Sequence, residues 1–249
     1  VQPQGAGKIT VNGVPLIHPE GKGDFFKNKP LHLAVFSMPG YQFVGWDGGS
    51  DSTTITYHCA MDTTFIAIFD VSNEFILPEV IEENTTLTNA HPYVVTQDLL
   101  IPSDILLTIQ EGVELRMFHG SNIHVEGQLF INGTEENPIH ITAYSSIENN
   151  RWGAICFTNA LDTSYISHTK ISGASTGIDP SVHHGAISSI NSHIVINHIE
   201  IEDVLFLPDI YIGKIPFDLR GFIRLDSGEI FGDKSSSNEG GWLKNIGVS

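Results

Sequence analysis

The chain has few basic residues for its length. Its 249 residues include 12 Lys and Arg against 29 Asp and Glu, which gives a formal net charge of −17. Proteins that hold nucleic acid concentrate cations to neutralise phosphates, so this composition argues against a nucleic-acid partner. We also expect no membrane span, because no run approaches the ~18 consecutive apolar residues that a transmembrane helix needs.

Charged residues and cysteines are scarce as well. Only 16% of the residues are charged, whereas Gly reaches 24 and Pro 12, a composition typical of short strands and frequent turns rather than long helices. The two cysteines, Cys59 and Cys156, lie far apart, each within an apolar, strand-like run. We expect two buried thiols, and the alternative is a disulfide between two separate domains.

The first part of the chain consists of short runs with alternating apolar residues, separated by turn sequences such as Asn12-Gly13 and Pro39-Gly40. Such alternation predicts half-buried antiparallel strands, and the turn sequences are favourable for reversing the chain. The predicted strands are 8–12, 31–36, 42–46, 53–57 and 65–69.

Three segments of this region resemble the internalin B-repeat, a small domain of bacterial surface proteins. They are Gly7-Lys-Ile-Thr-Val-Asn-Gly13, Pro39-Gly-Tyr-Gln-Phe-Val-Gly-Trp46 and Phe65-Ile-Ala-Ile-Phe69. The resemblance implies a mostly β, grasp-like fold in which the aromatics of the second segment lie in the core. We assign residues 1–71 to this B-repeat-like β domain. Residues 72–97, with Pro78 and an acidic cluster, are assigned to a linker and the lead-in to a second domain.

The second half of the chain contains an internal repeat. Gly153-Ala-Ile155, Gly185-Ala-Ile187 and Gly221-Phe-Ile223 recur 32 and then 36 residues apart. Ser164-x-Ile166 with Ile171 is echoed by Ser192-x-Ile194 with Ile199. Constant strand-like runs with loops of varying length are typical of solenoids, in which each coil buries its apolar residues against the next. The repeat therefore predicts a β-solenoid.

The order of motifs in this half resembles bacterial secreted proteins with a right-handed parallel β-helix. The motifs are Leu-Thr-Ile-x-x-Gly-Val from Leu107, Val-x-Gly-x-Leu-x-x-x-Gly-Thr from Val125, Asn-Pro-Ile-x-Ile-Thr from Asn137 and Trp-Gly-x-Ile from Trp152. In that family the glycines mark tight corners and the Trp lies where a long loop re-enters the stack. The pairing with a B-repeat-like domain resembles modular exoproteins of Bacteroidetes.

We therefore expect an all-β chain, with a small β-grasp-like repeat domain and a right-handed parallel β-helix, or solenoid, over residues 98–249. The pattern weakens after Phe206. That weakening fits either a cap or a helix truncated at its C-terminal end within a longer protein, and we favour the second interpretation.

No motif in the sequence identifies a catalysed reaction. A glycosidase needs two carboxylates at a set separation. The pair Glu200 and Glu202 shares one strand face but alternates with isoleucines, which favours a solvated surface. A lyase acting on acidic sugars needs a basic groove, and the few cations are dispersed. We therefore predict no catalytic residue. The alternative is a β-helix polysaccharide lyase or glycoside hydrolase whose site lies in loops or absent coils.

Ligand and metal candidates are few. Aromatic side chains can stack on sugar rings, so Arg151 and Trp152 beside one loop, and His183 and His184 in another, are the predicted ligand-binding residues. Tyr41, Trp46, Tyr57 and Tyr165 are further aromatic candidates, although Tyr41 and Trp46 are expected in the core of the first domain. Asp47 and Asp51 flank Gly48-Gly49-Ser50, and closely spaced oxygen ligands suit Ca²⁺, although Asp-Gly is first a turn signal. We expect no other cofactor.

These features together favour a non-catalytic binding or structural module of the bacterial cell surface or exterior. Its role would be adhesion or polysaccharide contact, and its partner an extracellular glycan or a surface protein. Two alternatives stay open: a carbohydrate-active enzyme on a β-helix, and a spacer within a longer surface protein.

Overall fold

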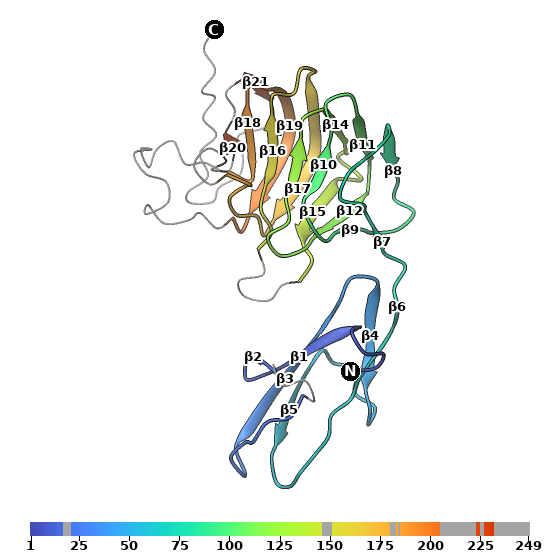
Figure 1. The fold of residues 1–249 in the computed structure, drawn as a ribbon, viewed down its shortest axis with the longest axis vertical. Helices are drawn as coiled ribbons and strands as arrows, with labels where there is room; N and C mark the ends of the chain where they lie inside the picture. Colours follow the sequence, from blue (N-terminus) through green and yellow to red (C-terminus); the bar gives the residue numbers. More distant parts are fainter. Residues whose placement is uncertain are drawn as a thin grey trace, which may run out of the picture. The chain divides into compact units, whose positions relative to one another are not determined.

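The computed structural model describes residues 1–16, 21–145, 151–179, 183, 185–204, 223–224 and 227–231. These residues form strands, bridges and turns and no helix, which confirms the all-β prediction for the described part of the chain. Within the same ranges, no helix is long and apolar enough to cross a membrane. The chain divides into two compact units, Val1–Glu74 and Phe75–Ser249 (Figure 1).

The first unit is antiparallel. One sheet has the order β2-β1-β3-β5, and a second pairs β4 with β6. The strands are β1 (Gly7–Val11), β2 (Val14–Pro15), β3 (Pro30–Ser37), β4 (Tyr41–Trp46), β5 (Thr54–His58) and β6 (Ala67–Val71). All five predicted strands are present. The structure divides them between two sheets, because β4 pairs with β6 rather than with β3.

Aromatic side chains lie in the core of the first unit together with aliphatic ones, as the resemblance implied for the segment from Pro39 to Trp46. The ring centroid of Phe43 lies 5.8 Å from that of Trp46 and 5.6 Å from that of Phe69, both edge to face. Trp46 and Phe69 are buried, and the Trp46 indole N–H donates to the carbonyl of Ser52. The polar edge of the ring is therefore satisfied without leaving the core.

The second unit is a parallel β-helix whose coils have three faces (Figure 1). The first face consists of β10 (Leu99–Ile101), β13 (Ile123–Val125), β16 (Ile155–Thr158), β18 (Ile187–Ile190) and β20 (Ile223–Arg224). The second consists of β8 (Thr85–Leu87), β11 (Leu106–Gln110), β14 (Gln128–Asn132), the first halves of β17 (Ser164–Ser172) and β19 (His193–Glu202), and β21 (Ser227–Phe231). The third consists of β7 (Phe75–Ile76), β9 (Tyr93–Val95), β12 (Glu114–Met117), β15 (Ile139–Ala143) and the second halves of β17 and β19.

The long strands β17 and β19 each serve two faces. β17 pairs with β14 before His168 and with β15 after it. His168 has a φ of 42°, and the equivalent His198 of β19 has a φ of 52°. This left-handed conformation bends the strand without ending it. The strands β7, β8 and β9 lie within residues 72–97, which we had assigned to the linker and lead-in.

Strand register confirms the Gly-x-Ile repeat. Ile155 pairs with Ile187, and Ile187 pairs with Ile223, so the spacings of 32 and 36 residues are the lengths of two successive coils. The glycines at the start of each repeat unit precede the strands of the first face. Gly221 itself, and most of the weaker pattern after Phe206, lie outside the described residues.

The predicted alignment of the two Ser-x-Ile segments is wrong by two residues. The sequence pattern aligned Ile166 with Ile194, whereas the structure pairs Ile166 with Ile196 and Ile171 with Ile201. Side chains along a strand alternate with a period of two, so a shift of two residues leaves every isoleucine on the same face. The local pattern therefore carries no information that separates the two alignments.

Ladders of aliphatic side chains fill the interior of the coils. On the second face, one ladder runs through Leu87, Ile109, Ile131, Ile166 and Ile196, one residue from each successive strand. All five are buried. Each such side chain contributes about 1.5–3 kcal/mol relative to an exposed one, so the stack of coils is held mainly by this interior.

Polar and glycine residues close the corners. The backbone N–H and side-chain amide of Asn122 both donate to Asp98 Oδ1, at 2.8 and 2.9 Å, and Asn122 Oδ1 accepts from the backbone N–H of Ala154. These bonds link three successive coils. At another corner Gly127 lies so close to the preceding coil that a Cβ would overlap the carbonyl oxygens of Pro102 and Ile105.

We predict that Gly127→Ala lowers the free energy of unfolding by about 3 kcal/mol, because backbone atoms must move to accept the methyl group. The matched control is Gly120→Ala. Gly120 has a φ of 76° but open space around it, so only the backbone conformation is strained, at about 1 kcal/mol. Urea unfolding of both variants measures the difference, and equal losses would contradict the steric explanation.

Candidate functional site

From β11 to β19, the outward positions of the second face carry no Asp, Glu, Lys or Arg. On the next strand, β21, Glu229 lies in register with Val195. Register places Phe130, Tyr165 and Val195 side by side on β14, β17 and β19, and we call them the apolar row. Two residues further along the same strands, Asn132, Ser167 and Asn197 form a polar row. Thr108 and Gln110 of β11 extend the two rows by one coil. We call this surface the neutral face.

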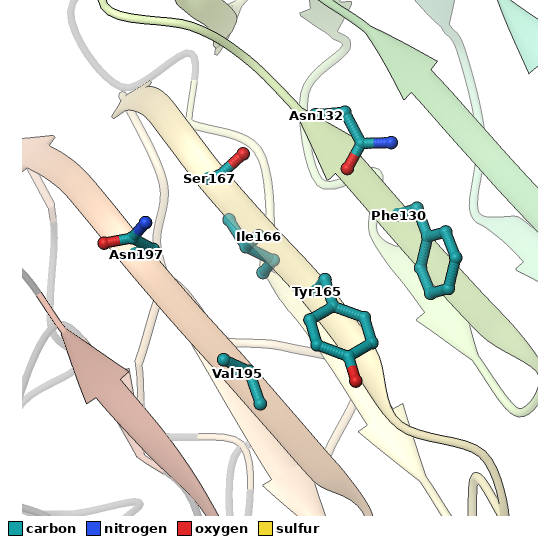
Figure 2. A pocket seen from close by; sticks show the side chains of 7 residues that line it. All are labelled: Phe130, Asn132, Tyr165, Ile166, Ser167, Val195 and Asn197. Atoms are coloured by element: carbon teal, nitrogen blue, oxygen red, sulfur yellow. The ribbon is translucent and has the colours of Figure 1, made fainter.

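A shallow groove of about 510 Å³ lies on the neutral face. Figure 2 shows the 7 side chains that line it: Phe130, Asn132, Tyr165, Ile166, Ser167, Val195 and Asn197. Phe130 and Tyr165 meet edge to face, with ring centroids 5.3 Å apart. Tyr165 is 46% exposed, so an aromatic ring on a rigid strand is open to solvent.

The hydrogen-bonding groups of the groove belong to neutral side chains. Ser167 Oγ lies 3.2 Å from the carbonyl oxygens of Ile131 and Gly133 and donates to the backbone. Asn132 is exposed and Asn197 half-buried, and each amide offers both donors and an acceptor. The groove therefore combines apolar contact with uncharged hydrogen bonding.

The outer surface of the third face differs in kind. Glu114, His140, Lys170 and Glu200 lie in register across β12, β15, β17 and β19. Lys170 Nζ lies 3.2 Å from Glu200 Oε2, and Arg116 Nε lies 2.8 Å from Glu114 Oε1. We call this surface the charged face. Glu200, one of the two carboxylates weighed above for catalysis, is thus paired with a lysine of the neighbouring coil.

The outer side of the first face is covered in part by the chain itself. Cys156 and Ser188 point outward in register, yet both are fully buried. The segment after β17 lies over Cys156, where a Cβ on Gly177 would overlap Cys156 Sγ, and Ser188 Oγ accepts from the backbone N–H of Gly185. Burial raises the pKa of the Cys156 thiol to about 12. A thiol held protonated at neutral pH is a poor nucleophile.

The predicted ligand-binding residues do not form one exposed site. Trp152 is fully buried, and its indole N–H donates to the carbonyl of Ser172 at 2.8 Å. His183 is 5% exposed, and its Nδ1 accepts from the backbone N–H of Asp179. A ligand in solvent has no ring face to contact at either residue. His184 lies outside the described residues.

Arg151 is partly exposed, and its side chain is paired with Asp203. Its guanidinium lies 2.6 Å from the carboxylate of Asp203 and also donates to the Asp203 backbone carbonyl. The bidentate contact fixes the start of the segment that leads into β16 against the end of β19.

Asp47 and Asp51, the predicted Ca²⁺ ligands, lie exposed in the loop between β4 and β5. Gly48 and Gly49 have φ values of 115° and 98°, and the loop is closed by a bond from the Trp46 N–H to the carbonyl of Ser50. Among the described residues, no group of three or more His, Cys, Asp or Glu could hold a metal ion. A Ca²⁺ site at these two carboxylates stays a prediction.

Sequence analysis missed most of the neutral face. Of its residues, only Tyr165 had been considered as a ligand contact, as one of five aromatic candidates. The signal for the rest is that Phe130, Tyr165 and Val195 occupy outward positions of the period-two pattern in successive coils. Recognising this alignment requires the register between coils. The sequence does not give that register, because the loops between these strands differ in length.

One family model matches the second unit. It is described as a pectate-lyase-like β-helix domain and matches residues 79–203, half of the chain. The matched range contains β8 to β19 and all the residues that line the groove. No curated protein and no solved structure matches the chain.

The two cysteines are free thiols, as predicted, although Cys59 is only partly buried. We predict that DTNB, at about pH 8, modifies Cys59 in the folded protein and Cys156 only after unfolding, because modification needs an accessible thiolate. Prompt reaction of both thiols in the folded protein would contradict the burial of Cys156.

The Cys156 thiol also predicts a dependence of stability on pH. Its pKa is about 12 in the folded protein against an ordinary value of 9.0. Above pH 9 the unfolded chain loses this proton while the folded chain keeps it, so stability falls as pH rises, by ~1.4 kcal/mol per pH unit at most. Urea unfolding between about pH 9 and 10 measures the slope, and Cys156→Ala is expected to flatten it.

Proposed function

The chain belongs to the family of pectate-lyase-like β-helix domains, and we propose that it is a non-catalytic extracellular module that binds a polysaccharide on the neutral face. The family supports a carbohydrate-related role. The groove lined by Phe130, Tyr165 and the two asparagines is the observation that carries the proposal.

The groove has the chemistry that sugar recognition requires. A pyranose ring has an apolar face of C–H groups, which packs on an aromatic side chain, and an edge of hydroxyls, which needs donors and acceptors. Tyr165 offers the exposed ring, and Asn132 and Asn197 offer amides on the strands to either side. Because all three side chains lie on strands of a rigid stack, little conformational entropy is lost on binding.

The same groove supports binding rather than catalysis. Hydrolysis of a glycosidic bond requires two carboxylates that flank it, and elimination requires a general base. None of the residues that line the groove carries a carboxylate, imidazole, amine or guanidinium. An enzyme on this β-helix would need a site elsewhere, and a spacer would need no site.

We further propose that the protein acts at the bacterial cell surface or outside the cell. The excess of acidic residues, the scarcity of lysine and the resemblance of the first unit to the B-repeat support this location. The first unit, proposed as a grasp-like B-repeat domain, would space or present the β-helix, whose hand we propose to be right. The ligand would be an extracellular glycan.

A glycan array with the purified chain tests the proposal, run with and without Ca²⁺ and followed by a reducing-end assay on each glycan that binds. We expect binding without release of sugar ends. Tyr165→Ala should weaken it about tenfold, since an aromatic contact of about 1.4 kcal/mol corresponds to that factor.

His140→Ala, on the charged face, is the matched control and should bind like the wild type. Both residues are exposed on strands, so thermal unfolding should show a similar, small loss for each. Release of reducing ends would overturn the proposal in favour of an enzyme, and the absence of binding to any glycan would favour a spacer. A requirement for Ca²⁺ would point to Asp47 and Asp51.

A further inference from the structure

We propose that the neutral face takes an uncharged, extended polysaccharide that lies across the strands, along the axis of the β-helix, with about one sugar per coil. This inference rests on the proposed function and specifies its ligand. Three features of the neutral face support it: the absence of charge, the direction of the rows and the bends that bound them.

The absence of charge selects an uncharged ligand. Neither row, nor Thr108 and Gln110 beyond them, contains a charged side chain, although the chain as a whole carries a net charge of −17. The residue next in register with Val195 is a glutamate, Glu229 of β21, and not a cation. An acidic polysaccharide would have to desolvate carboxylates on a surface with no cation to pair with them. The negative potential of the chain would also repel it.

The two rows give the ligand a direction. Across the strands, an apolar edge continues from Phe130 through Tyr165 to Val195, with about 4.8 Å between neighbouring strands. The polar row runs parallel to it, two residues or about 7 Å further along each strand. Along a single strand the character changes instead, since Tyr165 is followed on the same face by Ser167. A chain of sugar rings, each with one apolar face and hydroxyl edges, matches the rows only when it crosses the strands.

The bends at His168 and His198 bound the neutral face on one side. Beyond them the same strands present Lys170 and Glu200 of the charged face. A ligand that followed β17 would therefore leave the neutral surface within a few residues. A ligand that follows the helix axis stays on it from β11 to β19, which favours a straight, extended chain over a coiled one.

Isothermal titration with neutral oligosaccharides of increasing length tests the inference. Cello-oligosaccharides, from dimer to hexamer, are the extended probes, malto-oligosaccharides are the coiled ones, and oligogalacturonides are the acidic ones. We expect the affinity for cello-oligosaccharides to rise about tenfold from dimer to tetramer, and the tetramers of the other two series to bind at least about tenfold more weakly.

Substitutions one coil to either side of Tyr165 test the direction. Phe130→Ala and Val195→Ala should each weaken binding of the cello-hexamer several-fold, and each should reduce the gain from dimer to tetramer. A ligand lying along β17 would meet both positions only with the sugar over Tyr165, so the gain in affinity from dimer to tetramer would then match that of the wild type in both variants. His140→Ala is again the control, and unfolding midpoints show whether each variant is folded.

The outcomes separate this inference from the proposed function. If glycans bind but affinity does not rise with length, or if acidic oligosaccharides bind more tightly, the inference is wrong while the proposed function stands. If no glycan binds on the array, both fail. Sedimentation of the free chain completes the test, because self-association abolished by Tyr165→Asp would mean that the neutral face packs against a second copy, which also overturns both.

Discussion

In-register stacking of parallel strands is the constraint on which the rest of this structure depends. No single coil can bury its own Leu, Ile and Val side chains, so each coil is stable only on its neighbour. The ladder from Leu87 to Ile196 shows the result, one buried aliphatic side chain per strand on the same rung. Because inward and outward side chains alternate, the register that aligns the core also aligns the surface. The apolar and polar rows of the neutral face are a consequence of the packing beneath them.

The bends within β17 and β19 separate two surfaces of unlike chemistry. His168 and His198 adopt left-handed backbone conformations, and their rings stack at 4.6 Å with an interplanar angle of 4°. In the preceding coil the corresponding corner holds Gly133, where a Cβ would overlap the carbonyl oxygen of His168. Close approach of the backbones thus requires a glycine in one coil and permits stacked imidazoles in the next two. The same bends bring uncharged residues to one face and the Lys170–Glu200 pair to the other.

Residues that look reactive in the sequence are largely structural here. Trp152 lies in the hydrophobic core of the β-helix, and Cys156 and His183 are buried where the chain covers the outer side of the first face. Asp98 and Asn122 satisfy backbone groups at a corner. The groove on the neutral face is lined at its surface by Phe, Tyr, Val, Ser and Asn side chains, which form no recognisable sequence motif. Function on this fold is therefore argued from the site and its geometry rather than from the fold alone.

The sequence by itself determined the all-β class, the strands of the first unit and the Gly-x-Ile repeat of the β-helix, because alternation and turn residues act over a few neighbouring positions. Only the tertiary structure decided the alignment of Ile166 with Ile196, the burial of Trp152 and the meeting of Phe130, Tyr165 and Val195. These depend on how far each loop carries the chain before the next strand joins the stack. Loop lengths vary from coil to coil, and a period of two cannot distinguish registers that differ by two residues, so pairing between coils had to come from the fold.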